Sequence, residues 1–244
     1  MSESKKSNEF FKDSSVYRFI VFLVGFLAFF IISFIVSLVV SVILGQPADD
    51  DLPAKVKLLA YSNAFTYYAL FIVLLIVLIP AFGYLIKCFA KIKNVLIGLG
   101  IGALIIGVTL LYSLIIEKAF GVGDNNNQII AVRLIKDYPW VGLTAISFIG
   151  PFTEEITYRF GLFDLCKRKN VILAYIVSSL VFGLIHFDFT SSTMNIELLN
   201  LPSYIICGLG LAFAYDKFGF GASFSAHMIN NLYSTIMILL GSYK

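Results

Sequence analysis

Residues 19–48 read FIVFLVGFLAFFIISFIVSLVVSVILGQPA, a run without a single charged side chain. It is longer than the roughly 20 apolar residues with which an α-helix crosses the hydrocarbon core of a bilayer. The rest of the 244-residue chain is similar, because 59% of its residues are hydrophobic and only 14% are charged. This composition excludes an ordinary soluble domain and predicts a membrane protein.

Further charge-free stretches predict the other membrane spans. They are residues 58–86, 94–116, 138–153, 170–187, 198–215 and 218–243. Glu154 interrupts the fourth span, and we expect residues 140–165 to form one long helix that carries its charges within it. The expected fold is therefore all-α, a polytopic membrane helix bundle of about seven transmembrane helices. The count lies between six and eight, because the first run is long enough to be divided or tilted.

The expected domain organisation is simple. Residues 1–14 are rich in Ser, Lys, Glu and Asn and predict a disordered cytoplasmic tail, whereas residues 15–244 predict a single transmembrane domain. The longest loop covers residues 117–139, where the apolar spacing of residues 129–135 predicts an interfacial helix. We assign no catalytic role to this loop.

The distribution of Lys and Arg predicts the orientation. With the N-terminus inside, eleven Lys and Arg residues fall in segments expected on the cytoplasmic side and six on the opposite side. Positive residues near span ends are retained in the cytoplasm, so we expect a cytoplasmic N-terminus. The net charge of +3 fits contact with anionic lipid, and no basic aromatic stripe indicates nucleic-acid binding. Gly98 and Gly102, four residues apart, predict close packing between helices.

Six polar residues stand out in the second half of the chain. They are Glu154, Glu155, Arg159, His186, His227 and Asn231. A charge at the bilayer centre costs about 2.5–3.5 kcal/mol on insertion scales, so an ionisable residue inside a span is a functional candidate by default. The two histidines of the chain both belong to this group, which we therefore expect to hold the functional site.

The first motif is Glu154-Glu155-Ile-Thr-Tyr-Arg159. Residues four apart share a helix face and adjacent residues are about 100° apart, so Glu155 can pair with Arg159 while Glu154 points elsewhere. Glu154 is then the less compensated carboxylate, which suits it to accept a proton. From this motif alone, an ion-pair network that serves helix packing explains the residues equally well.

The second motif is Phe182-Gly-Leu-Ile-His186, near the end of the fifth predicted span. Phe182 lies one turn before His186 on the same face, where it can hold the ring or separate it from lipid. A lone histidine is usually a satisfied core residue. However, at 1.5 Å per residue Glu154 and His186 rise roughly 20 and 25 Å from the turn that joins their helices, so the two can meet.

The third motif is His227-Met-Ile-Asn230-Asn231 in the last predicted span. His227 and Asn231 share a face, and Asn230 is expected to point away from them. Their depth overlaps that of Glu154. Singly, each could be an interhelical hydrogen bond of the kind that membrane bundles use. Together with a basic carboxylate and a second imidazole, they supply donors suited to an oxyanion.

The three motifs, in this order and each on its own membrane helix, resemble the CAAX-protease-and-bacteriocin-processing family, also called the CPBP or Abi family. This family of intramembrane endopeptidases includes the type II CAAX prenyl endopeptidase. The resemblance covers about residues 100–240, and every motif position is filled. The chain also resembles bacterial members in being small and rich in Ile, Phe, Lys and Asn, which implies a multi-pass protein of a bacterial plasma membrane.

The resemblance implies a role for each motif residue. Glu154 and His186 would activate the attacking water, and His227 with Asn231 would stabilise the tetrahedral oxyanion. The supporting residues, which would hold the helix or line the site, are Glu155, Arg159 and Phe182. The expected partners are a membrane-associated peptide or protein substrate and the lipid bilayer, with no nucleic acid.

The cofactor is a point on which accounts of such enzymes differ, because the family is often labelled a metalloprotease. The chain has no HExxH motif. Zinc is the alternative, and Glu154, His186 and His227 could supply three ligands, but Glu154 would then be lost as the base. We favour activation of water without a metal, so no cofactor is expected.

The expected function is that of an intramembrane endopeptidase that hydrolyses peptide bonds of membrane-associated substrates, in peptide maturation or bacteriocin self-immunity. One alternative is a non-catalytic membrane scaffold or immunity protein of the same fold. A proton-coupled transporter, with the buried glutamates as a relay, is a weaker alternative because the chain shows neither paired broken helices nor repeat symmetry.

Overall fold

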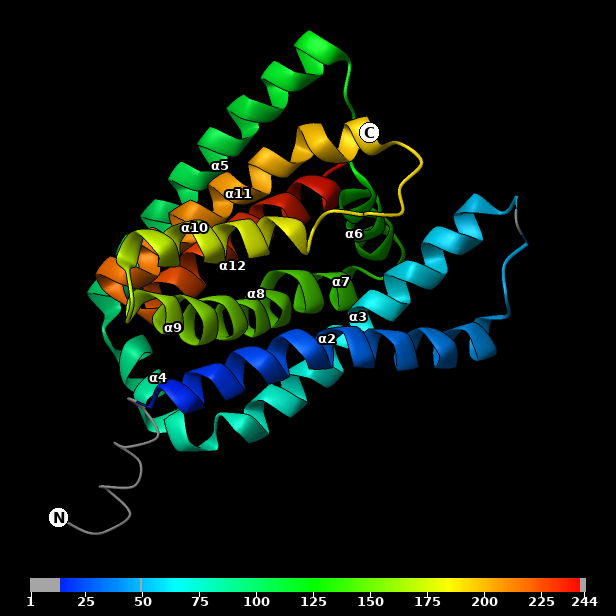
Figure 1. The fold of residues 1–244 in the computed structure, drawn as a ribbon. Coiled ribbons are helices and arrows are strands. Elements are labelled where there is room, and N and C mark those ends of the chain that lie inside the picture. The colour runs from blue at the N-terminus through cyan, green and yellow to red at the C-terminus, as the bar shows by residue number, and fades with distance from the viewer. Residues whose placement is uncertain (1–13, 49, 242–244) are drawn as a thin grey trace, which may run out of the picture.

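The computed structural model describes residues 14–48 and 50–241. Within these residues the chain consists of helices and loops, without a β-strand (Figure 1). The elements, in chain order, are α2 (Ser15–Leu44), α3 (Leu52–Val77), η1 (Ile79–Ala81), α4 (Phe82–Ala90), α5 (Ile92–Phe120), α6 (Asn126–Asp137), α7 (Pro139–Thr144), η2 (Ala145–Ile149), α8 (Gly150–Glu154), η3 (Glu155–Phe163), α9 (Asp164–Lys167), α10 (Val171–Leu184), α11 (Met194–Phe218) and α12 (Phe220–Leu239). The predicted disordered tail falls, apart from Ser14, outside the described residues.

Four helices of the described part, namely α2, α3, α5 and α11, are long and apolar enough to cross a membrane. The shortest of them, α11, has 25 residues, and at 1.5 Å per residue it exceeds a hydrocarbon core of about 30 Å. The all-α membrane bundle is therefore confirmed, but the count of about seven spans is not. The predicted spans at 138–153 and 170–187, and the described part of that at 218–243, are largely helical, yet they are shorter or carry the polar motif residues, so their crossing stays a prediction.

A central run of helical segments from Pro139 to Lys167 contains the first motif. It corresponds to the long helix expected over residues 140–165, but η2 and η3 within it are π-helical rather than α-helical. Such segments are frequent at functional sites. All nine residues of η3 are buried. Figure 1 shows this run in the middle of the bundle, between α10 to α12 and the pair α2 and α3.

The main apolar core surrounds η3. Phe160 and Phe163 of η3 are completely buried together with Leu74 of α3 and Phe220 of α12. The edge of the Tyr17 ring from α2 contacts the Phe160 ring, with the centroids 6.2 Å apart. Aromatic rings at this spacing and angle gain more than their buried area alone provides. The core therefore fixes the helix that carries the two glutamates from several sides.

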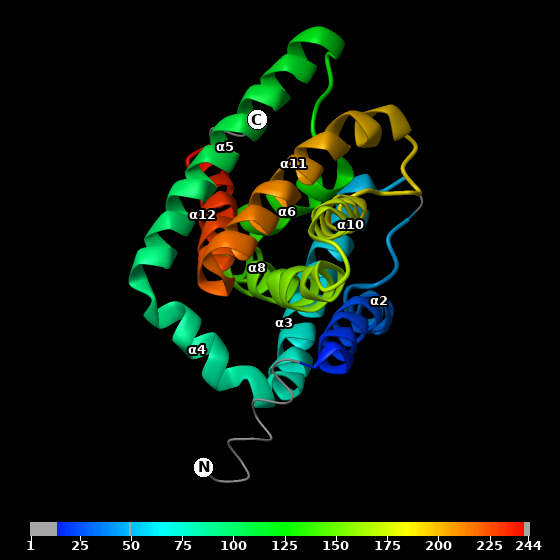
Figure 2. The same ribbon diagram turned by 60° about the vertical axis from the view of Figure 1, so that its left-hand side comes forward.

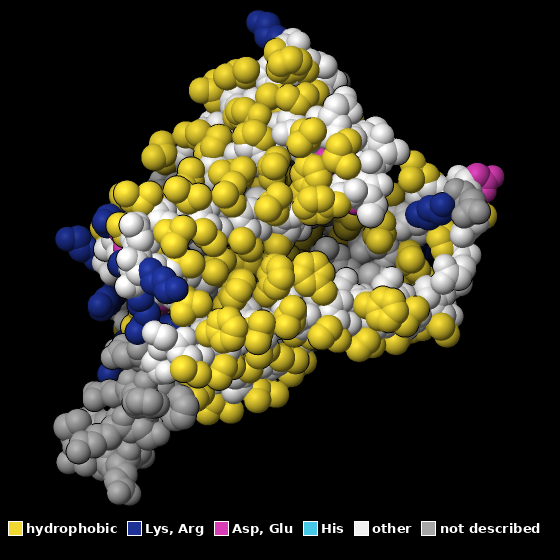
Figure 3. Space-filling model, in the orientation of Figure 1, with side chains coloured by type: hydrophobic (Ala, Val, Ile, Leu, Met, Phe, Trp, Pro, Cys, Tyr) yellow, Lys and Arg dark blue, Asp and Glu magenta, His cyan; other side chains and the backbone are white. Residues whose placement is uncertain are grey.

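The outer surface of the described residues is largely apolar (Figure 3). On α2, for example, Phe34 and Val42 are 68% and 84% exposed. Such extended apolar surface is unstable in water and suits contact with lipid. In Figure 3, Lys and Arg side chains gather mainly at the end of the molecule where α9 meets α10 and where α4 lies. Lys and Arg thus gather mainly at one end of the bundle in this view, as expected for positive residues on one side of a membrane. The cytoplasmic location of the N-terminus stays a prediction.

Two glycines let α5 lie directly against α12 (Figure 2). A Cβ atom at Gly98 would overlap the backbone of Ala222, and one at Gly102 would overlap the backbone of Ala226. Gly100, on another face of α5, would meet nothing. The predicted close packing through Gly98 and Gly102 is thus confirmed, and it places the last motif helix next to α5.

The long loop contains a helix, as predicted. The helix α5 ends at Gly121, whose φ of +64° is a left-handed conformation that glycine adopts readily. Asn125 then caps α6, because its side chain accepts a hydrogen bond from the backbone N–H of Gln128 at 3.1 Å. The helix expected over residues 129–135 is therefore confirmed, whereas its position at the membrane surface stays a prediction.

Candidate active site

Glu154 lies at the end of α8 with its carboxylate buried among three other polar side chains. Its exposed fraction is 7%. The hydroxyl of Tyr67, from α3, donates a hydrogen bond to Oε1. Oε2 has no hydrogen-bond partner, although Nε2 of His227 is 3.7 Å away and Nε2 of His186 is 4.0 Å away. An unpaired buried carboxylate oxygen is costly and marks a place where a further polar molecule can bind.

His227 lies between the two glutamates. Its Nδ1 is 3.0 Å from Oε1 of Glu155, and its Nε2 faces Oε2 of Glu154 on the opposite edge of the ring. When the ring is neutral, donation of the Nδ1 proton to Glu155 fixes the tautomer and leaves Nε2 as an acceptor. When the ring is protonated, Nε2 becomes a donor. Glu155 therefore orients His227 in either state.

The ion pair predicted between Glu155 and Arg159 is present. Nε of Arg159 is 3.5 Å from Oε2 of Glu155, and both side chains are fully buried. Arg159 also donates to the carbonyl of Gly208 at 3.3 Å and lies over the Phe182 ring. The expectation that Glu154 and Glu155 diverge holds, but both still reach the same residue, because His227 packs between them. Sequence spacing within one helix could not reveal that contact.

His186 follows the end of α10. Its Nδ1 is 2.8 Å from the carbonyl oxygen of Phe182, so the neutral ring donates there and turns Nε2 toward Glu154. The ring stacks on that of Tyr204 from α11, with centroids 4.6 Å apart. Phe182 also contacts the ring, at a centroid distance of 4.8 Å. The expected meeting of Glu154 and His186, and the expected contact with Phe182, are both confirmed.

Asn231 and Asn230 both belong to the site. Asn231 donates from Nδ2 to the carbonyl of Ile146 at 2.9 Å and accepts from Asn230 at 3.1 Å. Asn230 lines the same cavity as His227 and Asn231. The expectation that Asn230 points away is therefore wrong. It is based on the helix axis alone, whereas a long amide side chain can reach across the 100° that separates adjacent residues.

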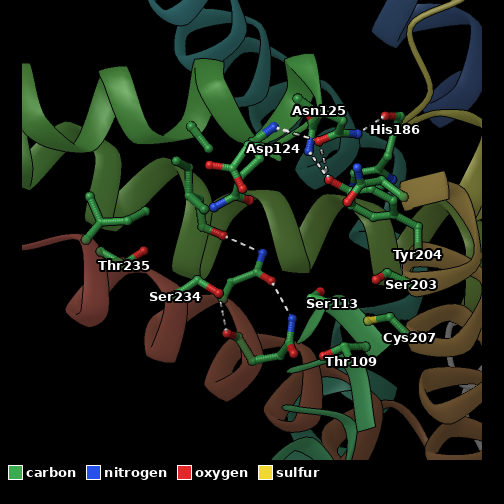
Figure 4. A pocket seen from close by; sticks show the side chains of 18 of the residues that line it. Thr109, Ser113, Asp124, Asn125, His186, Ser203, Tyr204, Cys207, Ser234 and Thr235 are labelled. Carbon is green, nitrogen blue, oxygen red and sulfur yellow. Dashed lines mark hydrogen bonds between the residues drawn. The ribbon is translucent and has the colours of Figure 1, made fainter. Parts of the chain in front are cut away.

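Two cavities meet at these residues. One of about 210 Å³ is lined by His186, His227 and Asn231 among others (Figure 4). A second, of about 70 Å³, is lined by Tyr67 and Glu154 and shares His186 and Asn231 with the first. The buried carboxylate and the two imidazoles can therefore be reached by a small molecule or by part of a chain.

The long loop holds His186 through a buried carboxylate on α11. Glu197, only 1% exposed, accepts from the backbone N–H of Asn126 at 2.9 Å and from that of Asp188 at 3.2 Å. Asn125 donates to the carbonyl of His186 at 3.4 Å. These bonds tie the start of α6 to the chain directly after His186. The loop of residues 117–139, to which we assigned no catalytic role, thus forms part of the wall of the site.

Several residues of the site escape sequence reasoning. Tyr67 is one of 13 tyrosines in an apolar chain and has no neighbouring motif. Tyr204 lies in a predicted span without any pattern that distinguishes it. Glu197 is visible in the sequence as a carboxylate at the edge of a predicted span. An acidic residue in the first turn of a helix commonly interacts with the helix dipole, so its position alone does not indicate a site. Asn125 reads as a turn residue, and its link to His186 depends on tertiary contacts.

Replacing Tyr67 by Phe is expected to lower any hydrolysis at this site by about tenfold, because a hydrogen bond to a charged group is worth about 1.5–3 kcal/mol and its loss leaves the Glu154 carboxylate less firmly held. Initial rates on a peptide substrate measure the effect. The matched control is Tyr68→Phe, which removes a hydroxyl bonded to Thr144 instead. Equal rates for the two variants would show that Tyr67 does not hold the Glu154 carboxylate.

Comparison with known proteins shows which proteins this region is similar to. Residues 136–233 match the family model described as Type II CAAX prenyl endopeptidase Rce1-like. An uncharacterized protein of Mycoplasma capricolum subsp. capricolum is 33% identical over 171 residues, which are 64% of this chain and 48% of that protein. A Bacillus subtilis protein named "Putative membrane peptidase YdiL" is 29% identical over 123 residues, 49% of this chain and 46% of that protein.

The chain thus spans about half the length of the curated relatives it matches. No solved structure matches it. The matched residues 136–233 include all seven predicted site residues, whereas Tyr67 and Asn125 lie outside them. The resemblance that the three motifs predicted is confirmed for residues 136–233, where this membrane protein is similar to the Type II CAAX prenyl endopeptidase Rce1-like family.

Proposed function

We propose that the protein is an intramembrane endopeptidase that hydrolyses peptide bonds of membrane-associated peptides or proteins, for peptide maturation or self-immunity. The single observation that supports this most is the unpartnered Oε2 of Glu154, which faces the Nε2 atoms of His186 and His227 beside the smaller cavity, which Glu154 and His186 line. A water molecule there would have both a proton acceptor and an orienting group. The catalytic assignment of Glu154, His186, His227 and Asn231 belongs to this proposal.

In the proposed reaction, water binds between Glu154 and Nε2 of His186. Glu154 takes one proton from it as the new bond forms between the water oxygen and the peptide carbonyl carbon. The carbonyl π electrons move to the oxygen. When the tetrahedral intermediate collapses, the C–N bond breaks and the amine leaves with the proton that Glu154 accepted. Glu154 would thus act first as the base and then as the acid in these two steps.

The oxyanion would be stabilised by His227 and Asn231. With Nδ1–H of His227 donated to Glu155, a proton on Nε2 of the same ring could be donated to the oxyanion. The second N–H of the Asn231 amide, the one not given to Ile146, could supply another bond. Removing one such donor typically costs 10²–10³-fold in rate.

A metal ion fits this arrangement less well. The donors are of the right kind, since the two imidazoles and a carboxylate are zinc ligands and each histidine Nδ1 is held by an oxygen. However, no group of three His, Cys, Asp or Glu residues in the described part of the chain is spaced to hold a metal. The Nε2 atoms would have to move toward Glu154. We therefore route no step of the reaction through a metal.

The proposal is tested with purified protein in lipid vesicles and a mixture of synthetic peptides, with new chain ends identified by mass spectrometry. We expect hydrolysis by the wild type that continues in the presence of a chelator. We expect a loss of at least about 10²-fold in His227→Ala and in His186→Ala. Loss on chelation and recovery with zinc would replace the metal-free mechanism. Undiminished hydrolysis by both variants would overturn the proposed site.

The alternative function to be distinguished from a peptidase is a non-catalytic scaffold or immunity protein of the same fold. In cells, a scaffold would keep its full phenotype in the same two variants, because its binding surface would be intact. A peptidase would lose the phenotype together with hydrolysis. Expression levels of the variants, measured in the same membranes, show whether a lost phenotype reflects lost chemistry or lost protein.

A further inference from the structure

The cavity beside the two histidines is unusually rich in uncharged polar groups for a site among membrane helices. It has a volume of about 210 Å³, below the roughly 300–1,000 Å³ of sites that take a whole small ligand, so it suits a short section of chain. Hydroxyl and amide side chains make up much of its wall. They include Ser113, Asn127, Gln128, Asn200, Ser203 and Asn230. Such groups can satisfy the N–H and C=O groups of an unwound peptide.

Apart from its two imidazoles, this cavity has one ionisable acidic side chain and no permanently cationic one among its described residues. Among the described residues that line it, Asp124 alone carries a carboxylate, and none is Lys or Arg. Figure 4 shows Asp124 beside Asn125 along one side of the cavity, with Thr109 and Ser113 on the opposite side. Behind that wall are the carboxylates of Glu197 and Asp188, which accept hydrogen bonds from Asn126. The wall formed by the described residues therefore lacks a Lys or Arg side chain that could hold a free C-terminal carboxylate.

Asp124 has no counterion of its own within the described part of the chain. By contrast, Asp137 at the end of α6 is paired with Arg133 at 2.8 Å. Asp124 is an exposed residue, but partial desolvation of its carboxylate raises its pKa, and the neighbouring carboxylate of Glu117 raises it further. An anion in such surroundings is stabilised when a positive charge arrives. The substrate is the natural source of that charge.

We propose that the cavity takes the section of substrate next to the bond that is cut, with a Lys or Arg side chain or an N-terminal ammonium group placed at Asp124. It follows that the substrates are internal peptide bonds in basic segments rather than bonds close to a free C-terminus. This inference rests on the proposed endopeptidase function and adds the substrate class to it. The hydroxyl and amide groups bind the backbone, and Asp124 selects the charge.

The test compares matched peptides that differ at one position, Lys or Gln, and that end in an amide or a free acid. With wild-type protein in vesicles we expect kcat/KM to be about tenfold higher for the Lys peptide, as one charge-assisted hydrogen bond provides. We also expect the C-terminal amide to be cut at least as fast as the acid. In Asp124→Asn the ratio of the Lys to the Gln peptide should fall close to one.

The control is Asp137→Asn, which removes a carboxylate of the same chain segment that does not line the cavity and should leave the ratio unchanged. Binding of the same peptides to Glu154→Gln is measured in parallel, because binding needs the cavity but not hydrolysis. Preferred binding of the Lys peptide without any cleavage by the wild type would sink the proposed function and keep this inference. Cleavage and binding that ignore the Lys, or that favour a free acid, would overturn the inference alone.

Discussion

Glu154→Gln is expected to lower peptide hydrolysis by about 10²–10⁴-fold, because the amide keeps the shape of the side chain but cannot take a proton from water. The hydrogen bond from Tyr67 can still be accepted by the amide oxygen, and Oε2 loses no partner because it has none. The variant should therefore fold normally. Mass spectrometry of membrane peptides from cells with either form would show substrates that accumulate uncleaved only with the variant.

The matched control is Asp137→Asn, which makes the same change from acid to amide at the exposed end of α6. It should leave the peptide profile as in the wild type. Equal profiles for Glu154→Gln and wild type, together with undiminished cleavage by the purified variant, would mean that another group accepts the proton. The control also excludes a general effect of losing one carboxylate from the protein.

Arg159→Met is expected to destabilise the protein by about 3–5 kcal/mol, because removing one partner leaves Glu155 charged and buried without compensation. The Arg159 side chain is fully buried, so solvent cannot replace it. The measurement is the thermal unfolding midpoint of the protein in detergent. Adding Glu155→Leu to this variant should restore most of the lost stability while hydrolysis stays absent, since His227 then has no orienting carboxylate.

Arg133→Met is the natural comparison, because Arg133 and Asp137 are also an arginine and a carboxylate four residues apart on one helix. Their side chains are 40% and 26% exposed, so losing this pair should cost less than about 1 kcal/mol. A result in which Arg159→Met is no less stable than Arg133→Met would show that the buried pair does not hold the helix.

The parts of the site that could be predicted are those written into single helices. The spacing of Glu155 and Arg159 predicts their contact. The number of residues from Glu154 to the turn, and from the turn to His186, predicts that Glu154 and His186 meet. Both contacts follow from the fixed rise and the fixed angle per residue of an α-helix. The all-α membrane fold follows from composition in the same direct way.

What could not be predicted depends on contacts between segments far apart in the chain. Tyr67 is 87 residues from Glu154, and Asn126 is 71 residues from Glu197. No local sequence pattern indicates either of these contacts. The number of membrane spans is also poorly determined by hydropathy, because the motif helices carry buried polar and charged residues, such as Glu155 and Arg159, that lower their mean hydropathy. The polar residues that form the candidate site are therefore the ones that make its helices hard to recognise as membrane spans.

The π-helical segments η2 and η3 have a consequence for how the chain can vary. Each hydrogen bond in them spans five residues instead of four, so the segments from Ala145 to Phe163 hold more residues than regular α-helix would hold over the same number of turns. Losing one residue there would favour regular helix and turn Glu154 away from His227. Surface loops commonly accept insertions and deletions. This buried stretch should be the least tolerant of a change in length, even one that leaves every motif residue in place.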